Sequence, residues 1–570
     1  MMANLPPAAI LIFGALLVPL LRGRTKTLFL LALPVLSFVH LLGLERGLHW
    51  QFELFGHPLI LARIDQLSLL WGYIFHLVTF LGVIYAIRVR DDVQHVTSLI
   101  YAGGAIGGAF AGDLITLFAF MELTAVSSVF LIWSRRTERA YKAGLRYVLV
   151  QIGSGMLMLA GLLIRLHETG SIAFDGLGLN GLGSQLIFVA FGIKCAFPFL
   201  HNWLQDAYPE ATVTGTVFLS AFTTKLAVYA LIRGFAGAEL LIWIGVAMAL
   251  FPIFYAVIEN DLRRALAYSL NNQLGFMVVG VGIGTELAIN GAAAHAFASI
   301  LYQALLFMAM GAVLHRTGTI KASELGGVYK SMPITTVFCL IGAASISAFP
   351  LFSGFVTKSL TMAATAEQGL VWPWLGLLFA SAGVMNHSGI RIPYCGFFGK
   401  DAGIRCQEAP ANMLVAMGLT AALCLGIGIF PHALYAILPY PVDFEPYTSS
   451  HVVTQLQLLL GALLAFAVLE FRRLEIPNLP SANLDSDWLY RRLLPNVAQA
   501  TLHGADRARS SLNNWAAHMP AALLAALSSN RLARSLRTRS QLTGSSVQMV
   551  LVLLSAYLLY FIVRNLLTPR

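Results

Sequence analysis

The sequence predicts an all-α, polytopic membrane protein with about 14–16 transmembrane helices. Of its 570 residues, 58% are hydrophobic and only 11% are charged, and the mean hydropathy is +0.74. A helix of roughly 20 apolar residues crosses a bilayer, and stretches of that kind recur along the whole chain. The 50 glycines and 22 prolines are consistent with closely packed and broken membrane helices.

Apolar stretches separated by polar loops give the expected helices in order. Fifteen of them precede a polar tail, at approximately 7–22, 27–45, 65–87, 96–111, 113–133, 143–164, 183–204, 212–234, 238–258, 262–283, 287–314, 333–364, 370–398, 411–430 and 452–471. The stretch at 333–364 is too long for one straight helix, and Pro350 is expected to break it. The polar tail covers 472–545, and one more apolar span follows at 546–564.

Lysine and arginine gather in alternate loops. The loops after spans 1, 3, 5, 9, 11 and 13 are basic, with Arg22, Arg24 and Lys26 in the first of them and Arg88 and Arg90 in the second. Because positive charge in short loops marks the cytoplasmic side, we expect the basic loops in the cytoplasm and the N-terminus outside. The loop after span 7 has no basic residue and is an exception. This distribution accounts for the net charge of +10 without a nucleic-acid partner.

The polar tail holds ten arginines and no lysine, which again is typical of the cytoplasmic side. Within it, residues 493–540 combine Leu and Ala with Arg at roughly helical spacing, interrupted at Pro520. Two interpretations remain open: an amphipathic helix that lies along the membrane face, or an inert basic linker.

No motif in the chain indicates a metal site or a bound cofactor. The five cysteines show no C-x-x-C spacing, so neither zinc nor an iron–sulfur cluster is expected. A phosphate-binding Walker motif and a convincing dinucleotide fingerprint are also missing from the sequence. We therefore expect a transporter subunit that has no cofactor and no catalytic chemistry of its own.

Charged or titratable residues interrupt five of the apolar stretches. They are Glu122, Lys194, Lys225, His295 and Lys358. A charge at the centre of a lone transmembrane helix costs roughly 2.5–3.5 kcal/mol, so it is normally excluded unless it has a partner or a wet cavity. Five such residues on five segments predict a pathway for protons or ions.

Two prolines are expected to break the helices that carry two of these lysines. Pro198 lies four residues after Lys194 and cannot donate the hydrogen bond that the carbonyl of Lys194 would accept in an intact helix. Pro350 lies eight residues before Lys358. Broken helices mark ion sites at the midplane of transporters, and a pair of them suggests an internal repeat.

Glu122 is a natural partner for an intramembrane lysine. An acid beside a lysine favours the protonated amine, and protonation of the acid removes that effect. The pair is therefore interpreted as a proton switch, with a static buried ion pair as the alternative.

Several polar residues could relay protons between the charged groups. We place Thr224, Ser299, Gln303, Asn271 and Gln273 in this class. Ser299 and Gln303 share one helical face with His295, at spacings of four and eight residues. The stripe that contains Asn271 and Gln273 is equally consistent with helix packing. Asp206 and Glu210, near the cytoplasmic end of span 7, are either a proton entry point or solvated loop carboxylates, and the loop interpretation is slightly favoured.

Four segments resemble a known family. FAFMELTAVSSVF, FGIKCAFPFLHNWLQDAYPEATVTGTVFLSAFTTKLAVYAL, ENDLRRALAYSLNNQLGFMVVG and ISAFPLFSGFVTKSL are similar to the antiporter-like subunits shared by Mrp-type monovalent cation/proton antiporters and respiratory complex I. The resemblance covers about residues 60–430 and is closest to the D-type subunit of the Mrp antiporters.

The resemblance implies two inverted five-helix repeats, spans 4–8 and 9–13, with helices 7 and 12 broken and a hydrated polar axis between them. The five family positions that carry protons match Glu122, Lys194, Lys225, His295 and Lys358. The implied organisation is 1–95 for the N-terminal helices and an extracytoplasmic loop, 96–235 and 236–400 for the repeats, 401–471 for the C-terminal helices, 472–545 for the basic linker or lateral helix, and 546–570 for the last span.

The chain departs from the family at two points. The family often has a second histidine and a lysine where this chain has Ser299 and Gln303, so the central axis would depend more on water around His295. The tail and last span resemble the lateral helix and anchor of the distal complex I subunit.

The expected function is that of a proton-translocating subunit in a multisubunit sodium or potassium/proton antiporter of the cell membrane. Its expected partners are other membrane subunits, protons, monovalent cations and the lipid bilayer, and no nucleic acid. Alternatives are a pumping subunit of a complex I-like NADH dehydrogenase or membrane-bound hydrogenase, the membrane partner of an inorganic-carbon uptake system, and a scaffold whose buried charges only hold helices together.

Overall fold

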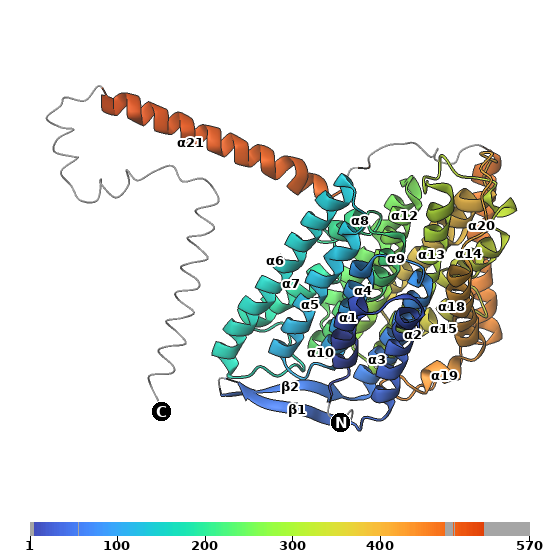
Figure 1. Cartoon of the computed structure of the whole chain (residues 1–570), viewed down its shortest axis with the longest axis horizontal. Helices are drawn as coiled ribbons and strands as arrows, with labels where there is room; N and C mark the ends of the chain where they lie inside the picture. The colour runs from blue at the N-terminus through green and yellow to red at the C-terminus, as the bar shows by residue number, and fades with distance from the viewer. Residues whose placement is uncertain (1–4, 55, 473–482, 484, 518–570) are drawn as a thin grey trace. The chain divides into compact units, whose positions relative to one another are not determined.

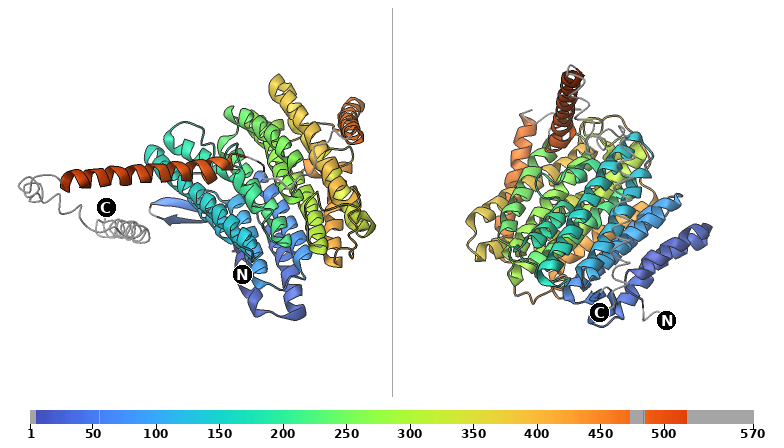
Figure 2. Two further views of the ribbon diagram at one scale, coloured as in Figure 1. Left: turned by 90° about the horizontal axis from the view of Figure 1, so that it is seen from above. Right: turned by 90° about the vertical axis from the view of Figure 1, so that its left-hand side faces the viewer.

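The computed structural model describes residues 5–54, 56–472, 483 and 485–517. The span expected at 546–564 lies outside these residues. The chain divides into two compact units, 1–486 and 487–570. The first unit is a bundle of helices that run side by side, with a short hairpin at one end (Figure 1). The two further views in Figure 2 show the same side-by-side packing.

The helices of the first half of the bundle are α1 (Ala9–Leu17), α2 (Gly23–Leu42), α3 (Gln66–Ala86), α4 (Asp92–Phe110), α5 (Leu114–Trp133), α6 (Glu138–Thr169), α7 (Leu182–Lys194), α8 (Asn202–Ala207), α9 (Val213–Ala221) and α10 (Thr223–Phe235). The second half contains α11 (Leu240–Ile258), α12 (Leu262–Ile283), α13 (Glu286–Thr317), α14 (Pro333–Ile346), α15 (Ser353–Glu367), α16 (Val371–Val384), α17 (Arg391–Pro393), α18 (Ala411–Ile429), α19 (Pro431–Tyr435) and α20 (Ser449–Phe471). Two π-helical segments, η4 (Met385–Ile390) and η5 (Tyr394–Phe398), flank α17. Short 3-10 turns are η2 (Val18–Leu20) and η3 (Val328–Lys330).

The second unit begins with a π-helical segment, η6 (Leu489–Leu493), that continues into α21 (Leu494–Ala517). The helix expected in the basic tail therefore forms as far as Ala517. The interruption expected at Pro520 lies outside the described residues.

The predicted class of a polytopic all-α membrane protein is confirmed. Within the described residues, nine helices are long and apolar enough to cross a membrane, and shorter apolar helices such as α7 and α14 lie among them. The central helix α13 is buried over nearly its whole length. Other helices surround it, so its polar residues, which include His295 and Gln303, are buried together with its apolar ones.

The loop expected between the second and third spans contains the one β-structure of the described chain. Strands β1 (Gly47–Leu54) and β2 (His57–Ile64) pair antiparallel, with Gly47 opposite Ile64. The amide of Ile60 donates to Asp113 Oδ2 at 2.7 Å, which fastens the hairpin to the start of α5. The loop is thus a structured cover at this end of the bundle.

Both proline breaks form where the sequence predicts them. The first separates α7 from α8 and the second separates α14 from α15. The residue two before the proline and the residue after it have positive φ in each break: Ala196 (62°) and Phe199 (67°) in the first, Ala348 (58°) and Leu351 (74°) in the second. Because non-glycine residues seldom adopt this conformation, its repetition is strong evidence that the two breaks are equivalent turns.

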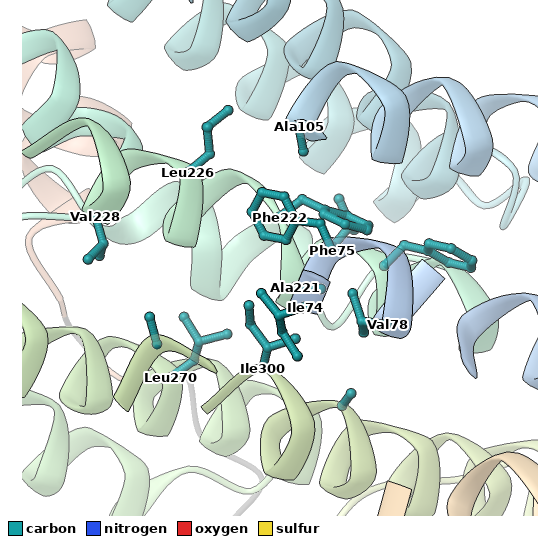
Figure 3. Close-up of a cluster of buried hydrophobic side chains, with 14 of the residues drawn as sticks. Ile74, Phe75, Val78, Ala105, Ala221, Phe222, Leu226, Val228, Leu270 and Ile300 are labelled. Atoms are coloured by element: carbon teal, nitrogen blue, oxygen red, sulfur yellow. The ribbon is translucent and has the colours of Figure 1, made fainter. Parts of the chain in front are cut away.

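A third break has no proline. The stretch at 212–234, expected as one helix, consists of α9 and α10 joined at Phe222. Phe222 is fully buried, and its ring packs edge-on against Phe75 and Tyr101, with centroids 5.2 and 5.1 Å away. Figure 3 shows Phe222 and Phe75 within a cluster of buried apolar side chains. The Tyr101 hydroxyl accepts from the amide of Thr223 at 3.0 Å, so tertiary contacts hold this break open.

Glycines allow α11 and α12 to pack closely in the second half. A Cβ added at Gly245 on α11 would lie 2.6 Å from the amide nitrogen of Val279, and one at Gly275 on α12 would lie 2.4 Å from that of Ala249. The two backbones therefore touch, as small residues permit in membrane helices. This packing fixes α12, which carries the polar stripe discussed below.

Candidate functional site

Glu122 and Lys194 meet inside the first half of the bundle, as the sequence suggested. Glu122 lies midway along α5 and Lys194 is the last residue of α7. Lys194 Nζ is 3.7 Å from Glu122 Oε1 and donates to Gln151 Oε1 at 3.4 Å. The lysine side chain is 2% exposed and the glutamate side chain 25%. The pair is asymmetric: the lysine side chain is enclosed, whereas the glutamate side chain is partly exposed, although its Oε1 is buried.

A glycine on α6 makes room for the carboxylate. A Cβ added at Gly155 would lie 2.1 Å from Glu122 Oε1, closer than any real contact. Gly153, on the same helix, has open space at the corresponding position. Gly155 is therefore a positioning residue that the sequence analysis missed, because its role depends on a neighbour from another helix.

The breaks expose backbone carbonyls, and side chains satisfy them. In the second break, Pro350 cannot donate to the carbonyl of Ile346, and Lys358 Nζ takes its place at 2.7 Å. In the first break, Trp203 Nε1 donates to the carbonyl of Ile193 at 2.9 Å. Lys358 is thus bound to the backbone of the break itself, although it lies eight residues beyond the proline.

Lys225 likewise binds a backbone carbonyl at a helix break, in this case the third one. It is fully buried on α10, and its Nζ donates to the carbonyl of Ser220 at 2.8 Å, across the interruption at Phe222. Among the described residues, neither Lys225 nor Lys358 has a carboxylate within ion-pair distance. A carbonyl accepts a hydrogen bond from an amine in either protonation state, so this arrangement does not commit these lysines to a fixed charge.

His295 connects the central helix to the second break. Its Nδ1 is 3.1 Å from Thr357 Oγ1, next to Lys358, and its Nε2 is 3.3 Å from the Tyr302 hydroxyl. That hydroxyl donates to Gln273 Oε1 at 3.0 Å. Thr357 and Tyr302 were missed from the sequence, although Tyr302 lies seven residues after His295 and therefore shares its helical face.

The expected relay residues are buried, and four of them, Thr224, Asn271, Ser299 and Gln303, have side-chain polar atoms with no hydrogen-bond partner among the described residues. These atoms are Thr224 Oγ1, Ser299 Oγ and both side-chain polar atoms of Asn271 and Gln303. Buried polar atoms are normally satisfied, and water is the usual partner where the protein supplies none. Gln273 differs, because it bonds to Asn272 and to Tyr302. Ser299 is fully buried one turn after His295.

Beyond Lys358 a small cavity leads toward α20. It has a volume of about 30 Å³, which is room for roughly one water molecule. Its wall includes Lys358, Ser381, His451 and Gln455. Gln455 donates to the carbonyl of Ala348 at 3.1 Å, so α20 is bound to the second break. No sequence signal had singled out His451.

A second histidine lies in the π-helical segment η4. His387 is buried, and its Nδ1 is 2.7 Å from Ser388 Oγ, which donates to Ser269 Oγ at 2.7 Å. Its Nε2 has no partner among the described residues. π-Helical turns occur frequently at functional sites, and none is visible in a sequence pattern.

The two carboxylates near the end of the first break are ion-paired. Arg146 Nε lies 2.5 Å from Asp206 Oδ2, and Arg135 Nη1 lies 3.3 Å from Glu210 Oε2. These pairs bind the C-terminal end of α5 and the first half of α6 to α8 and the loop after it. Asp206 is buried and lies on α8, so it is not the solvated loop carboxylate that was slightly favoured.

A short segment after α20 is hydrogen-bonded to the start of α8 and to α12. We call Asn483, Asp485 and Ser486 the strap. Asp485 Oδ2 accepts from His201 Nε2 at 3.2 Å and from the Tyr268 hydroxyl at 2.7 Å, and Ser486 Oγ donates to Asn202 Oδ1 at 2.5 Å. Burial raises the pKa of Asp485, but the hydrogen bond and charge of His201, with the Tyr268 and Ser486 bonds, outweigh it and lower this pKa to about 2.

Asp485→Asn is expected to release the strap. The carboxylate stabilises the strap fully above its ordinary pKa of 3.8, and this contribution is lost as the pH falls toward 2. After correction for the pH dependence of intrinsic exchange, the protection factor of a peptide that covers the strap should be roughly tenfold lower in the variant at neutral pH. In the wild type this protection factor should fall between about pH 4 and pH 2. Asp443→Asn, at an exposed position, is the control. Unchanged exchange in Asp485→Asn would show that the carboxylate does not hold the strap.

The fold and the buried charges together define an integral membrane protein whose broken helices carry lysines into its interior. The transmembrane model of the NADH:quinone oxidoreductase/Mrp antiporter family matches residues 111–385. This segment contains all five charged positions named above. The match confirms the resemblance to the antiporter-like membrane subunits of this family that was drawn from the four motifs.

Curated relatives come from both kinds of complex. The A/B subunit of a probable K(+)/H(+) antiporter of Rhizobium meliloti is 30% identical over 391 residues, 62% of this chain and 39% of the relative. The A-type subunit of the Na(+)/H(+) antiporter of Alkalihalophilus pseudofirmus is 27% identical over 493 residues, 74% of this chain and 61% of the relative. The N-type subunit of the NADH-quinone oxidoreductase of Desulforudis audaxviator is 28% identical over 440 residues, 69% of this chain and 86% of the relative.

The chain spans less than two thirds of the length of these two antiporter subunits. The closer likeness to D-type subunits stays a prediction, because both antiporter relatives are named as A-type or A/B subunits.

Solved structures share the fold. A chain of the Mrp complex from Dietzia sp. DQ12-45-1b gives a TM-score of 0.66 at 19% identity, covering 81% of this chain and 99% of that one. A chain of respiratory complex I from Thermus thermophilus gives 0.68 at 22%, covering 80% and 100%.

Proposed function

We propose that this chain is a proton-translocating subunit of a multisubunit monovalent cation/proton antiporter. The observation that carries the proposal is the succession of buried titratable groups on three helix breaks: the Glu122–Lys194 pair, Lys225, and His295 beside Lys358. A scaffold would pair each buried charge with a counter-charge. Two of the three lysines are instead bound to backbone carbonyls.

Glu122 is the proposed point of proton uptake. It is the partly exposed member of its pair, so a proton can reach the carboxylate without passing the lysine. Protonation removes the charge that holds the ammonium of Lys194, and the amine can then pass its proton inward. Lys225 and His295 would receive it in turn, through water bound to Thr224, Asn271 and Gln303.

Lys358 and the cavity beside α20 form the proposed exit. His295 reaches this lysine through Thr357, and the cavity places His451 and Gln455 on its other side. The alternation of basic loops supports an extracytoplasmic position for the start of α20, because it follows span 14. Protons would therefore leave on the side opposite the basic loops, and His387 is a further group that could accept one near Lys358.

The expected repeats, 96–235 and 236–400, remain part of this proposal. The matching φ angles of the two proline breaks support their equivalence. The names of the relatives support an assembly with other membrane subunits, and sodium or potassium as the exchanged ion. An isolated subunit is not expected to exchange cations, since the described residues show no oxygen-rich cation site.

The test is transport by the complex purified gently from its native membrane. Reconstituted into vesicles that contain a pH-sensitive dye, it should move protons when a sodium or potassium gradient is imposed. Mass spectrometry of the same sample identifies the partners. Small hydrophobic subunits without redox centres support the antiporter, and vesicles that show no cation-driven pH change would refute it.

A redox-driven pump is the second candidate. The relation to the N-type subunit of NADH-quinone oxidoreductase, of which this chain covers 86%, favours it. In this case iron–sulfur or flavin subunits would co-purify, and proton movement would require an electron donor. The proposed proton path inside this chain would be the same.

Gly155→Ala is expected to impair transport by displacing one carboxylate. The added methyl group occupies the position of Glu122 Oε1, so the carboxylate must move away from Lys194. A shift of about 1 Å in a reacting group can cost 100-fold, and we expect proton movement to fall roughly 10- to 100-fold. Gly153→Ala, on the same helix with open space at its Cβ, should stay within about twofold of wild type. Equal transport by the two variants would contradict the role given to Glu122.

A further inference from the structure

The basic loops after the first and third spans converge on one cavity. Its volume is about 430 Å³, within the size range of small-ligand sites. Four cationic side chains line it, Arg22 and Lys26 from the start of α2 and Arg88 and Arg90 from the α3–α4 loop, and Asp92 is the one carboxylate. The cavity is therefore strongly positive.

Little in the described chain neutralises this charge. Asp92 forms an ion pair with Lys26, whereas Arg22, Arg88 and Arg90 have no ion-pair partner among the described residues. Asp91, next to the cavity, accepts from the amide of Val93 and pairs with Arg136 instead. Three guanidinium groups thus line the cavity without a counter-charge, because its one carboxylate is paired with Lys26.

The start of α2 adds a second feature that favours an anion. Its N-cap residue, Arg22, makes no side-chain cap, so the free amides of the first turn are not satisfied by a side chain. Gly23 and Thr27 of this turn also line the cavity. Unsatisfied amides and the helix dipole make such an end attractive to phosphate groups.

The loop on the opposite wall is held in place. His95 is buried, and its Nε2 is 2.9 Å from the carbonyl of Val89. This contact ties the loop that carries Arg88 and Arg90 to the first turn of α4. The wall of the cavity that the α3–α4 loop forms is therefore held in place before any ligand binds.

Apolar residues complete the wall and continue outward. Leu21, Leu30 and Ile87 line the cavity. Leu20, beside it, is 77% exposed, and Leu28 is 67% exposed. A ligand for this place needs an anionic head and apolar tails, because a charged cavity opens beside an exposed apolar face.

We propose that this cavity binds the phosphodiester headgroup of an anionic phospholipid, with the acyl chains along α1 and α2. Basic pockets between membrane helices on the cytoplasmic side bind such headgroups in other proteins. The proposal does not depend on the transport function. Arg24 lies in the first turn of α2 but does not line the cavity, which gives a matched control.

The test compares two double variants of the complete complex in detergent. Arg88→Gln with Arg90→Gln removes two cavity cations, and Arg24→Gln with Arg139→Gln removes two exposed arginines elsewhere. Native mass spectrometry is used to titrate phosphatidylglycerol and phosphatidylcholine. Because each cation near the surface contributes about 1 kcal/mol, phosphatidylglycerol should bind the first variant roughly 10- to 30-fold more weakly, with less than a threefold change in the second.

Three results would overturn the proposal. Equal binding of phosphatidylglycerol by both variants would exclude this cavity. Equal competition by soluble glycerol phosphate would indicate a site for free anions rather than for lipid. Loss of a neighbouring subunit from the first variant, with unchanged lipid binding, would assign the cavity to a protein interface. Equal thermal unfolding of the two variants controls for the fold.

Discussion

Lys194→Ala is expected to abolish cation-driven proton movement by the assembled complex. Lys194 Nζ is the group that the carboxylate of Glu122 faces at 3.7 Å, and it ends the helix at the first break. Alanine has no titratable group, so the proton has no acceptor between the partly exposed carboxylate and the interior. We expect transport to fall to background in the vesicle assay, a loss of at least about 100-fold.

The matched control is Lys142→Ala. Lys142 is an exposed lysine on α6, paired with Glu138, and its loss should leave transport within about twofold. Glu122→Gln combined with Lys194→Met tests the scaffold interpretation, because it removes both charges together. An assembled complex that transports normally with this double change would disprove the proton path and leave a structural role for the pair.

Arg263→Leu is expected to prevent stable folding. Arg263 begins α12 and is 1% exposed, and its guanidinium donates at 3.1–3.2 Å to four main-chain carbonyls in the segment 208–212, and also to the Thr216 hydroxyl. Leucine removes all of these charge-assisted hydrogen bonds. The carbonyls of residues 208, 209 and 212 keep other donors, whereas the carbonyl of Ala211 is left without one among the described residues, at a cost of about 1–3 kcal/mol for that group. The total loss is of the order of 3–5 kcal/mol or more.

The measurement is the yield of monodisperse protein after mild extraction, together with its thermal unfolding. We expect a several-fold lower yield and earlier unfolding, since a loss of this size changes abundance in cells. Arg139→Leu, at an exposed position, is the control and should behave as wild type. Normal yield and unfolding of Arg263→Leu would show that water can replace the guanidinium in the 208–212 segment.

Part of the site was accessible from the sequence because two prolines dictate local geometry. Pro198 and Pro350 have no amide hydrogen, so the helices must break near them whatever the surroundings. The pairing of Glu122 with Lys194 was also predictable, since a buried ammonium needs a partner and few carboxylates lie in the apolar stretches. The repeated A-F-P sequence at both breaks was a further signal, and it marks the shared positive φ angles.

Other parts depended on contacts that no local pattern contains. The break at Phe222 has no proline or glycine, and it exists because Phe75 and Tyr101 pack around it. The role of Gly155 follows from a carboxylate on another helix. The strap lies more than 200 residues from Tyr268 in sequence, so its hydrogen bonds cannot be inferred from spacing.

The sequence by itself determined the membrane class, the order of the helices, the two proline breaks and the identity of the buried charges. These follow from the hydrophobicity, covalent geometry and charge of single residues and their near neighbours. Only the tertiary structure decided which backbone carbonyl each lysine binds, where the third break falls, and which histidines lie beside Lys358. Side chains from distant helices define these features, because in a packed interior each polar group must find its partner wherever the fold brings one within hydrogen-bond distance.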